Sequence, residues 1–217
     1  MMIFINAIKQ QIDQCIQSHI LIDSDPLQHE ILEHAIQCKT YIAKFHGRSD
    51  VLNRALKWWS GRSFSVILRF LGTTRPSSTI RKTLLSISQQ ICKLYNLSMD
   101  LCSDILQLRY QLETNLFLKI PKNEYLIILL DSIDQLETDA YDCEWLPIFF
   151  SKNVKCIVST LPDHGDILSN FEIIIYYDPS WIENTQHLLV LVPPFEASTV
   201  DSVFNDWRVW VWVRLQI

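Results

Sequence analysis

The sequence predicts an α/β fold in which a helical arm precedes a parallel β-sheet. Two observations support this prediction. Continuous apolar runs have the length of buried strands, and segments long enough for helices separate most of them. Because these runs do not alternate between apolar and polar residues, they are typical of parallel strands covered on both faces. The runs are SVILRF (65–70), YLIILL (125–130), VKCIVS (154–159), FEIIIYY (171–177) and HLLVLV (187–192).

The predicted helices follow from apolar residues at helical spacing. Residues 1–46 form the arm, with one helix over 3–20 and a second over 27–44, separated by the break DSDP. The segment RPSSTIRKTLLSISQQICKLY begins with a Pro-Ser-Ser start signal and predicts the clearest helix of the chain. Two further helices are expected over 50–59 and 98–117.

Composition indicates a globular protein of one α/β domain, with or without an arm. The 217 residues are 48% hydrophobic and 20% charged. The net charge of −5, with scattered Lys and Arg, indicates no basic patch for nucleic acid. The first residues lack a basic leader, and no run reaches the 18 or so apolar residues that span a bilayer. The six cysteines form no C-x-x-C pair, so we expect reduced thiols in a cytoplasmic protein without membrane partners.

One motif carries chemistry. The run YLIILL leads directly into DSIDQL, which places Asp131 after a buried strand and Asp134 three residues later. A parallel strand delivers such a carboxylate to the carboxyl edge of the sheet, where it can hold Mg²⁺ near phosphates. The pattern is therefore Walker B-like. The alternative, that Asp131 only caps the next helix, stays open.

The order of several blocks makes the resemblance to a family specific. The segments VILRFLGTTRPSSTIRKTLLSISQQICKLY, YLIILLDSIDQL, VKCIVSTLPD and LLVLVPPFEASTVDSVFNDW resemble successive parts of the NACHT-type P-loop NTPase domain, a member of the STAND class. The nearest resemblance is to the NACHT and WD-repeat proteins and their telomerase-associated relatives, over about residues 29–207. It implies ATP and Mg²⁺ as ligands of the full-length family, protein partners or self-association, and a γ-phosphate sensor at Ser159 and Thr160.

The phosphate-binding loop of that family is missing. No glycine is followed by lysine, and Arg48 and Val66 are too close for the first strand, loop and helix. Residues 47–207 therefore resemble an incomplete domain of P-loop type, which is not expected to bind a cofactor itself. In the family the lost strand lies between the runs 154–159 and 187–192. We expect two unpaired edges there, unless they close on each other or the run 171–177 fills the gap.

Two departures from the family bear on function. Gln135 stands where a glutamate that orients the attacking water is frequent. Because the phosphate loop is missing as well, we predict no catalytic residue and no catalytic activity. Residues 208–217, RVWVWVRLQI, form a divergent, strand-prone tail; a membrane anchor is the less favoured interpretation. In HEILEH, His29 and His34 are five residues apart and cannot share a zinc ion on a helix.

The favoured hypothesis is a fragment or truncated isoform of a signalling NTPase, acting as a regulatory or scaffold module with impaired nucleotide binding. Two alternatives remain. The first is a slow Mg²⁺-dependent ATPase switch that uses Asp131 and Asp134. The second is a helical adaptor without a nucleotide role.

Overall fold

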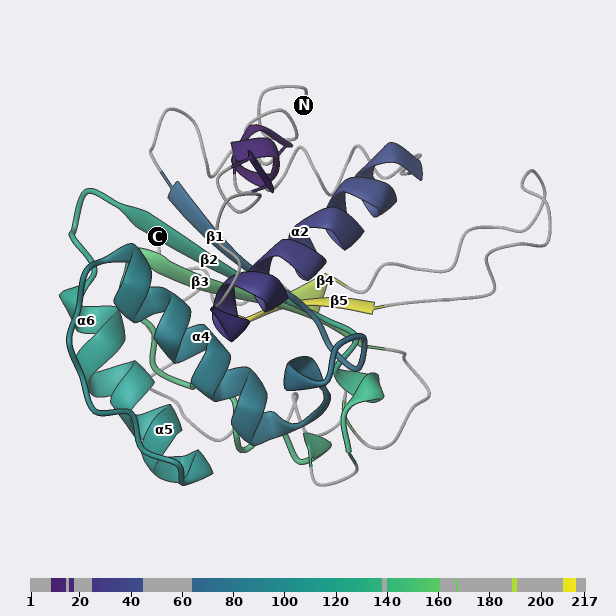
Figure 1. The fold of residues 1–217 in the computed structure, drawn as a ribbon. Coiled ribbons are helices and arrows are strands. Elements are labelled where there is room, and N and C mark those ends of the chain that lie inside the picture. The colour runs from purple at the N-terminus through teal and green to yellow at the C-terminus, as the bar shows by residue number, and fades with distance from the viewer. Residues whose placement is uncertain are drawn as a thin grey trace.

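A computed structural model describes residues 9–14, 16–17, 25–44, 64–137, 140–160, 167, 189–190 and 209–213 (Figure 1). Residues 9–14 and 16–17 are helical. The named elements are α2 (Pro26–Lys44), β1 (Phe64–Phe70), η1 (Pro76–Ser78), α4 (Ile80–Leu94), α5 (Ile105–Gln111), η2 (Leu112–Leu116), α6 (Phe117–Lys119), β2 (Tyr125–Asp131), η3 (Ile133–Gln135), β3 (Val154–Thr160), β4 (Leu189–Val190) and β5 (Val209–Val213). The helix predicted over 50–59 and the strand predicted over 171–177 lie outside the described residues.

Three of the predicted parallel strands are present in the predicted order. β1 pairs with β2 and β2 pairs with β3, all parallel, and Phe70 lies opposite Asp131. Their sequences consist largely of branched and long apolar residues, which suit a strand packed on both sides. The prediction that YLIILL lies between SVILRF and VKCIVS is therefore confirmed.

The rest of the sheet corrects the sequence-based expectation. The strand order is β1-β2-β3-β5-β4, so β5 lies between β3 and β4 and pairs with both in antiparallel fashion. The expected unpaired edge of β3 is wrong, and the sheet is mixed rather than all-parallel. The physical reason is that the Val-Trp run has high strand propensity and finds backbone partners on both sides.

The two faces of the sheet have different neighbours. Side chains alternate along a strand, and Ile67, Ile128 and Cys156 all belong to the buried core that includes α4 and α5. In Figure 1, α4, α5 and α6 gather together, while α2 lies apart from α5 and α6. The opposite parity places Phe70 and Asp131 on the second face, which α2 contacts through Phe70.

The free edge of β1 is covered by side chains of the arm. The carbonyl of Phe64 accepts a hydrogen bond from Gln11 Nε2, and the Phe70 N–H donates to His34 Nδ1 at 3.2 Å. Between them, Arg69 Nη1 donates to the carbonyl of Leu68 at 2.8 Å. An edge strand with open backbone groups invites pairing with another chain, and these bonds block that pairing.

The helices agree with the sequence except at their ends. α2 and α4 match the predicted segments. The helix predicted over 98–117 begins later, at Ile105, because the Asp104 side chain caps α5 by accepting a hydrogen bond from the Gln107 N–H at 2.9 Å. The helical segment then continues through a π-helical turn, η2, and ends at Lys119. Five cysteines are free thiols, as expected: Cys38, Cys92, Cys102, Cys143 and Cys156. Among the described residues, no helix combines the length and apolarity needed to cross a bilayer.

Candidate functional site

The carboxyl ends of β2 and β3 bring a carboxylate and a hydroxyl together. Ser159 Oγ donates to Asp131 Oδ1 and accepts from the Ser132 N–H at 2.9 Å. Ser132 has a left-handed backbone, with φ 71° and ψ 59°, which turns the chain sharply after the strand. The same hydroxyl therefore fixes the carboxylate and the turn that follows it.

The other two predicted residues lie near this pair with other contacts. Asp134 is buried on η3, where its Oδ2 accepts from Gln135 Nε2 at 2.6 Å and its carbonyl accepts from Tyr141 Oη at 3.3 Å. Thr160 is buried at the end of β3 and lies opposite Val209 of β5. The structure thus joins Asp131 to Ser159 and engages Asp134 with its neighbour Gln135.

The turn after β1 packs directly against the turn after β2. Gly72 has φ +74°, and a Cβ atom added there would lie 2.7 Å from Gln135 Cβ and 3.0 Å from the Gln135 carbonyl oxygen. The positive φ favours glycine, and the close approach of Gln135 leaves no room for a Cβ atom. The hydroxyls of Thr73 and Ser77 donate to the carbonyl of Phe70 at 2.6 and 3.1 Å. Hydroxyl groups of this turn therefore bond its own backbone.

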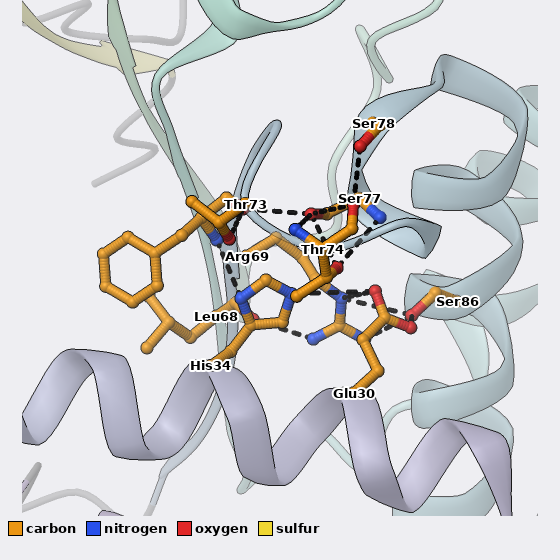
Figure 2. A network of polar contacts seen from close by, with 10 residues as sticks. Glu30, His34, Leu68, Arg69, Thr73, Thr74, Ser77, Ser78 and Ser86 are labelled. Atoms are coloured by element: carbon orange, nitrogen blue, oxygen red, sulfur yellow. Dashed lines mark hydrogen bonds and ion pairs between the residues drawn. The ribbon is translucent and has the colours of Figure 1, made fainter.

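A buried charged network ties α2 to the sheet (Figure 2). Arg69, fully buried, donates from Nε and Nη2 to Ser86 Oγ of α4 at 3.1 and 2.6 Å. Ser86 Oγ donates in turn to Glu30 Oε2 at 2.6 Å, and Arg69 Nε lies 3.4 Å from Glu30 Oε1. His34, one helical turn after Glu30, places Nε2 3.6 Å from the same Oε1. The network connects three elements at the edge of the sheet.

Burial sets the charges in this network. Burial lowers the pKa of Arg69 to about 10, and Glu30 opposes that shift, so the guanidinium stays charged at neutral pH. Burial would raise the pKa of Glu30, but His34, Arg69 and Ser86 bring the pKa below its usual value. Burial lowers the pKa of His34, which favours the neutral imidazole that accepts from Phe70.

Sequence reasoning missed this network, although two signals for it exist. Glu30 and His34 are four residues apart, which places both on one side of a helix. Arg69 interrupts an otherwise apolar strand, and a charge inside a buried strand requires a partner. Neither signal reveals that Ser86 joins them, because that contact depends on how α4 packs.

The Asp131 edge fits Mg²⁺ only as one part of a larger ligand set. Within the described part of the chain, no group of three or more His, Cys, Asp or Glu side chains is placed to hold a metal ion. Mg²⁺ typically binds through one or two carboxylates, several waters and substrate phosphates. Asp131, with Ser159 beside it, fits that role, whereas buried Asp134 is engaged by Gln135.

The fold and this edge are consistent with a P-loop-like α/β protein, and comparison with known proteins narrows the class. The chain is similar to NACHT and WD repeat domain-containing protein 2 of Homo sapiens, with 26% identity over 215 aligned residues that cover 79% of this chain. The protein of the same name from Mus musculus is 27% identical over 216 residues, with the same coverage. These similarities support a relationship to the NACHT family.

The extent of the similarity has two further features. The chain spans only 12% of the length of either relative. The alignment is 215 positions long, but it covers only 79% of this chain. Some aligned positions of the relative therefore have no counterpart in this chain. No protein-family model matches the chain, and no solved structure matches it significantly.

Proposed function

We propose that this chain is a cytoplasmic regulatory or scaffold module, related to the NACHT-type STAND NTPases, in which nucleotide binding is impaired. The similarity to NACHT and WD repeat domain-containing protein 2 supports the relationship. The Asp131–Ser159 pair has the chemistry of a Walker B carboxylate with a neighbouring sensor hydroxyl. An active enzyme of this class would combine such a pair with a phosphate-binding loop. We propose that this chain keeps the pair and lacks the loop.

The direction of β5 is the observation that carries the proposal. A phosphate loop follows the carboxyl end of a parallel strand and leads into a helix, whose N-terminal N–H groups hold the phosphates. β5 is antiparallel to β3, and its first residue, Val209, lies opposite Thr160. The carboxyl end of β5 therefore lies at the opposite end of the strands from Asp131, and a loop that followed β5 would not reach this carboxylate. The absence of any Gly-Lys pair in the sequence supports the same conclusion.

The retained pair favours a second candidate, a slow Mg²⁺-dependent ATPase switch. Asp131 is held by Ser159 at the edge where ligands of parallel sheets bind. In this candidate Asp131 would hold a water of the Mg²⁺ ion, and Mg²⁺ would neutralise phosphate charge. Gln135 cannot act as a carboxylate base, and its amide is already bonded to Asp134, so we expect any hydrolysis to be slow.

Titration calorimetry of the whole chain with Mg²⁺–ATP tests the proposal. We expect no saturable binding below the millimolar range. The variants Asp131→Ala and Asp100→Ala, the latter at an exposed acidic residue, should then behave like the wild type. Micromolar affinity that Asp131→Ala abolishes and Asp100→Ala leaves intact would overturn the proposal and favour the ATPase. A helical adaptor predicts no nucleotide effect in any assay.

Protein partners or self-association are part of the same proposal, without nucleic acid or membrane. The helical segment α5–η2–α6 supports it, because Leu106, Tyr110 and Leu118 are each more than 60% exposed. Leu106 and Tyr110 lie four positions apart on α5 and so share one face of the helix, and contiguous exposed apolar surface of this kind marks contact sites. Sedimentation velocity should show association that rises with concentration and weakens in Leu118→Glu. Monomers at all concentrations would contradict self-association.

A further inference from the structure

Polar groups make up most of the buried side chains described on helix α2. The buried ones are Gln28, Glu30, His34 and Ala35, whereas the apolar Leu27, Ile31 and Leu32 are only partly buried. A surface helix of a stable domain normally buries an apolar face. The docking of α2 therefore depends in large part on specific hydrogen bonds and ion pairs, which can be broken without opening the apolar core.

The helix covers the face to which Asp131 points. Phe70 and Asp131 lie opposite each other in the register of β1 and β2, so their side chains share one face. On α2, the Tyr41 ring meets the Phe70 ring edge-on at 5.1 Å, and His34 binds the Phe70 N–H. Burial, together with the nearby Asp131 carboxylate, raises the pKa of the Cys38 thiol to about 12. α2 thus packs on the face of the sheet that carries the carboxylate of the candidate site.

The ionic contacts of Glu30 Oε1 in this attachment are long. The atom is buried and lies 3.4 Å from Arg69 Nε and 3.6 Å from His34 Nε2, and neither contact is a hydrogen bond of good geometry. Buried charged groups held by such long contacts stabilise the docked state less than full hydrogen bonds would, and water would solvate these groups after release.

We infer that α2 is a releasable strap, which Glu30, His34, Arg69 and Ser86 hold over the Asp131–Ser159 edge. Docked, it covers the second face beside Asp131 and protects the free edge of β1. Released, it opens that face to a ligand and frees Cys38. This device goes beyond the proposed function, because it concerns access to the edge and holds for any ligand that reaches it.

The reactivity of Cys38 reports release directly. In the docked state its thiol is half-buried and stays protonated, so a maleimide should label it slowly. Cys156 lies in β3 inside the core and becomes reactive only when the domain unfolds. Labelling of the whole chain, measured residue by residue by peptide mass spectrometry, therefore separates release of α2 from global unfolding.

Two serines of α4 give a matched pair of variants. Ser86→Ala removes the hydroxyl that joins Arg69 to Glu30. Ser88→Ala removes an equally buried hydroxyl that bonds only within the helix, to Leu84 O at 2.8 Å. We expect Ser86→Ala to label Cys38 at least about tenfold faster, from the loss of hydrogen bonds to charged groups, with Ser88→Ala unchanged. Cys156 should stay unlabelled in both.

Unchanged Cys38 labelling in Ser86→Ala, or equal acceleration of Cys38 and Cys156, would overturn the strap. Glu30→Gln gives a second measurement, because it keeps the size of the side chain while removing its charge. It should also accelerate Cys38 alone, and failure to do so counts against the strap. Calorimetry with Mg²⁺–ATP tests the proposed function separately, and its outcome does not alter these labelling results.

Discussion

Replacing Arg69 by methionine should destabilise the domain strongly. Arg69 is fully buried and makes hydrogen bonds to Ser86 Oγ and to the carbonyl of Leu68. Its removal also leaves the Glu30 carboxylate, 3% exposed, without its cation. Breaking a buried ion pair in this way costs about 3–5 kcal/mol. That cost is a large part of the roughly 5–15 kcal/mol by which a domain of this kind is stable.

A double-mutant cycle separates the charge effect from the loss of packing. In Glu30→Met/Arg69→Met both charges are gone, and such replacements of buried pairs are often close to neutral. We therefore expect the double variant to be more stable than Arg69→Met alone, with a coupling energy of about 2–4 kcal/mol. Urea unfolding followed through tryptophan fluorescence, to which buried Trp145 and the six other tryptophans contribute, with circular dichroism as the second probe, measures all corners of the cycle.

Arg81 provides the control for this cycle. It lies exposed on α4, and Arg81→Met should change the free energy of unfolding by less than about 0.5 kcal/mol. A cost below about 1 kcal/mol for Arg69→Met would refute the reasoning. Strict additivity of the Glu30 and Arg69 substitutions would refute it as well, since partners in one buried pair must couple.

Three further outcomes follow from the same structure. Gly72→Ala should cost about 1–3 kcal/mol in urea unfolding, since its φ is positive and the new Cβ meets the Gln135 backbone; no loss would show that the turn can shift. Ser159→Ala should cost about 1–3 kcal/mol because it leaves the Ser132 N–H without its acceptor, and a neutral result would contradict that bond. The lowered pKa of His34 means that the fold favours its neutral form. The contribution of His34 to the free energy of unfolding is therefore complete above about pH 6.5 and is lost as the pH falls further. A pH titration of the urea midpoint should show this loss in the wild type and not in His34→Gln.

Local sequence patterns predict the centre of the fold well. The runs that became β1, β2 and β3 consist mainly of apolar residues, with Arg69 and Lys155 as the charged residues inside them. Continuous apolar runs of this length are typical of buried parallel strands. The pairing of Asp131 with Ser159 follows from the same patterns, because the carboxyl ends of neighbouring parallel strands meet at one edge.

The features that sequence could not give depend on contacts between distant segments. The Val-Trp run of β5 predicts a strand, but its partners, β3 and β4, are set by the whole sheet. Gly72 is required by the approach of Gln135, which lies more than sixty positions later in the chain. The contact of Ser86 with Glu30 likewise depends on the packing of α4 beside α2.

The position of β5 has a consequence for the order in which the sheet assembles. Thr160 pairs with Val209, so the chain must close a loop of nearly fifty residues before β3 gains its second neighbour. β1, β2 and β3 all precede β5 in the chain and can pair first. Until β5 arrives, β3 presents a free edge that another copy of the chain can occupy. The yield of refolding should therefore fall as protein concentration rises, even though β5 pairs with residues Cys156 to Thr160 of this edge in the native sheet.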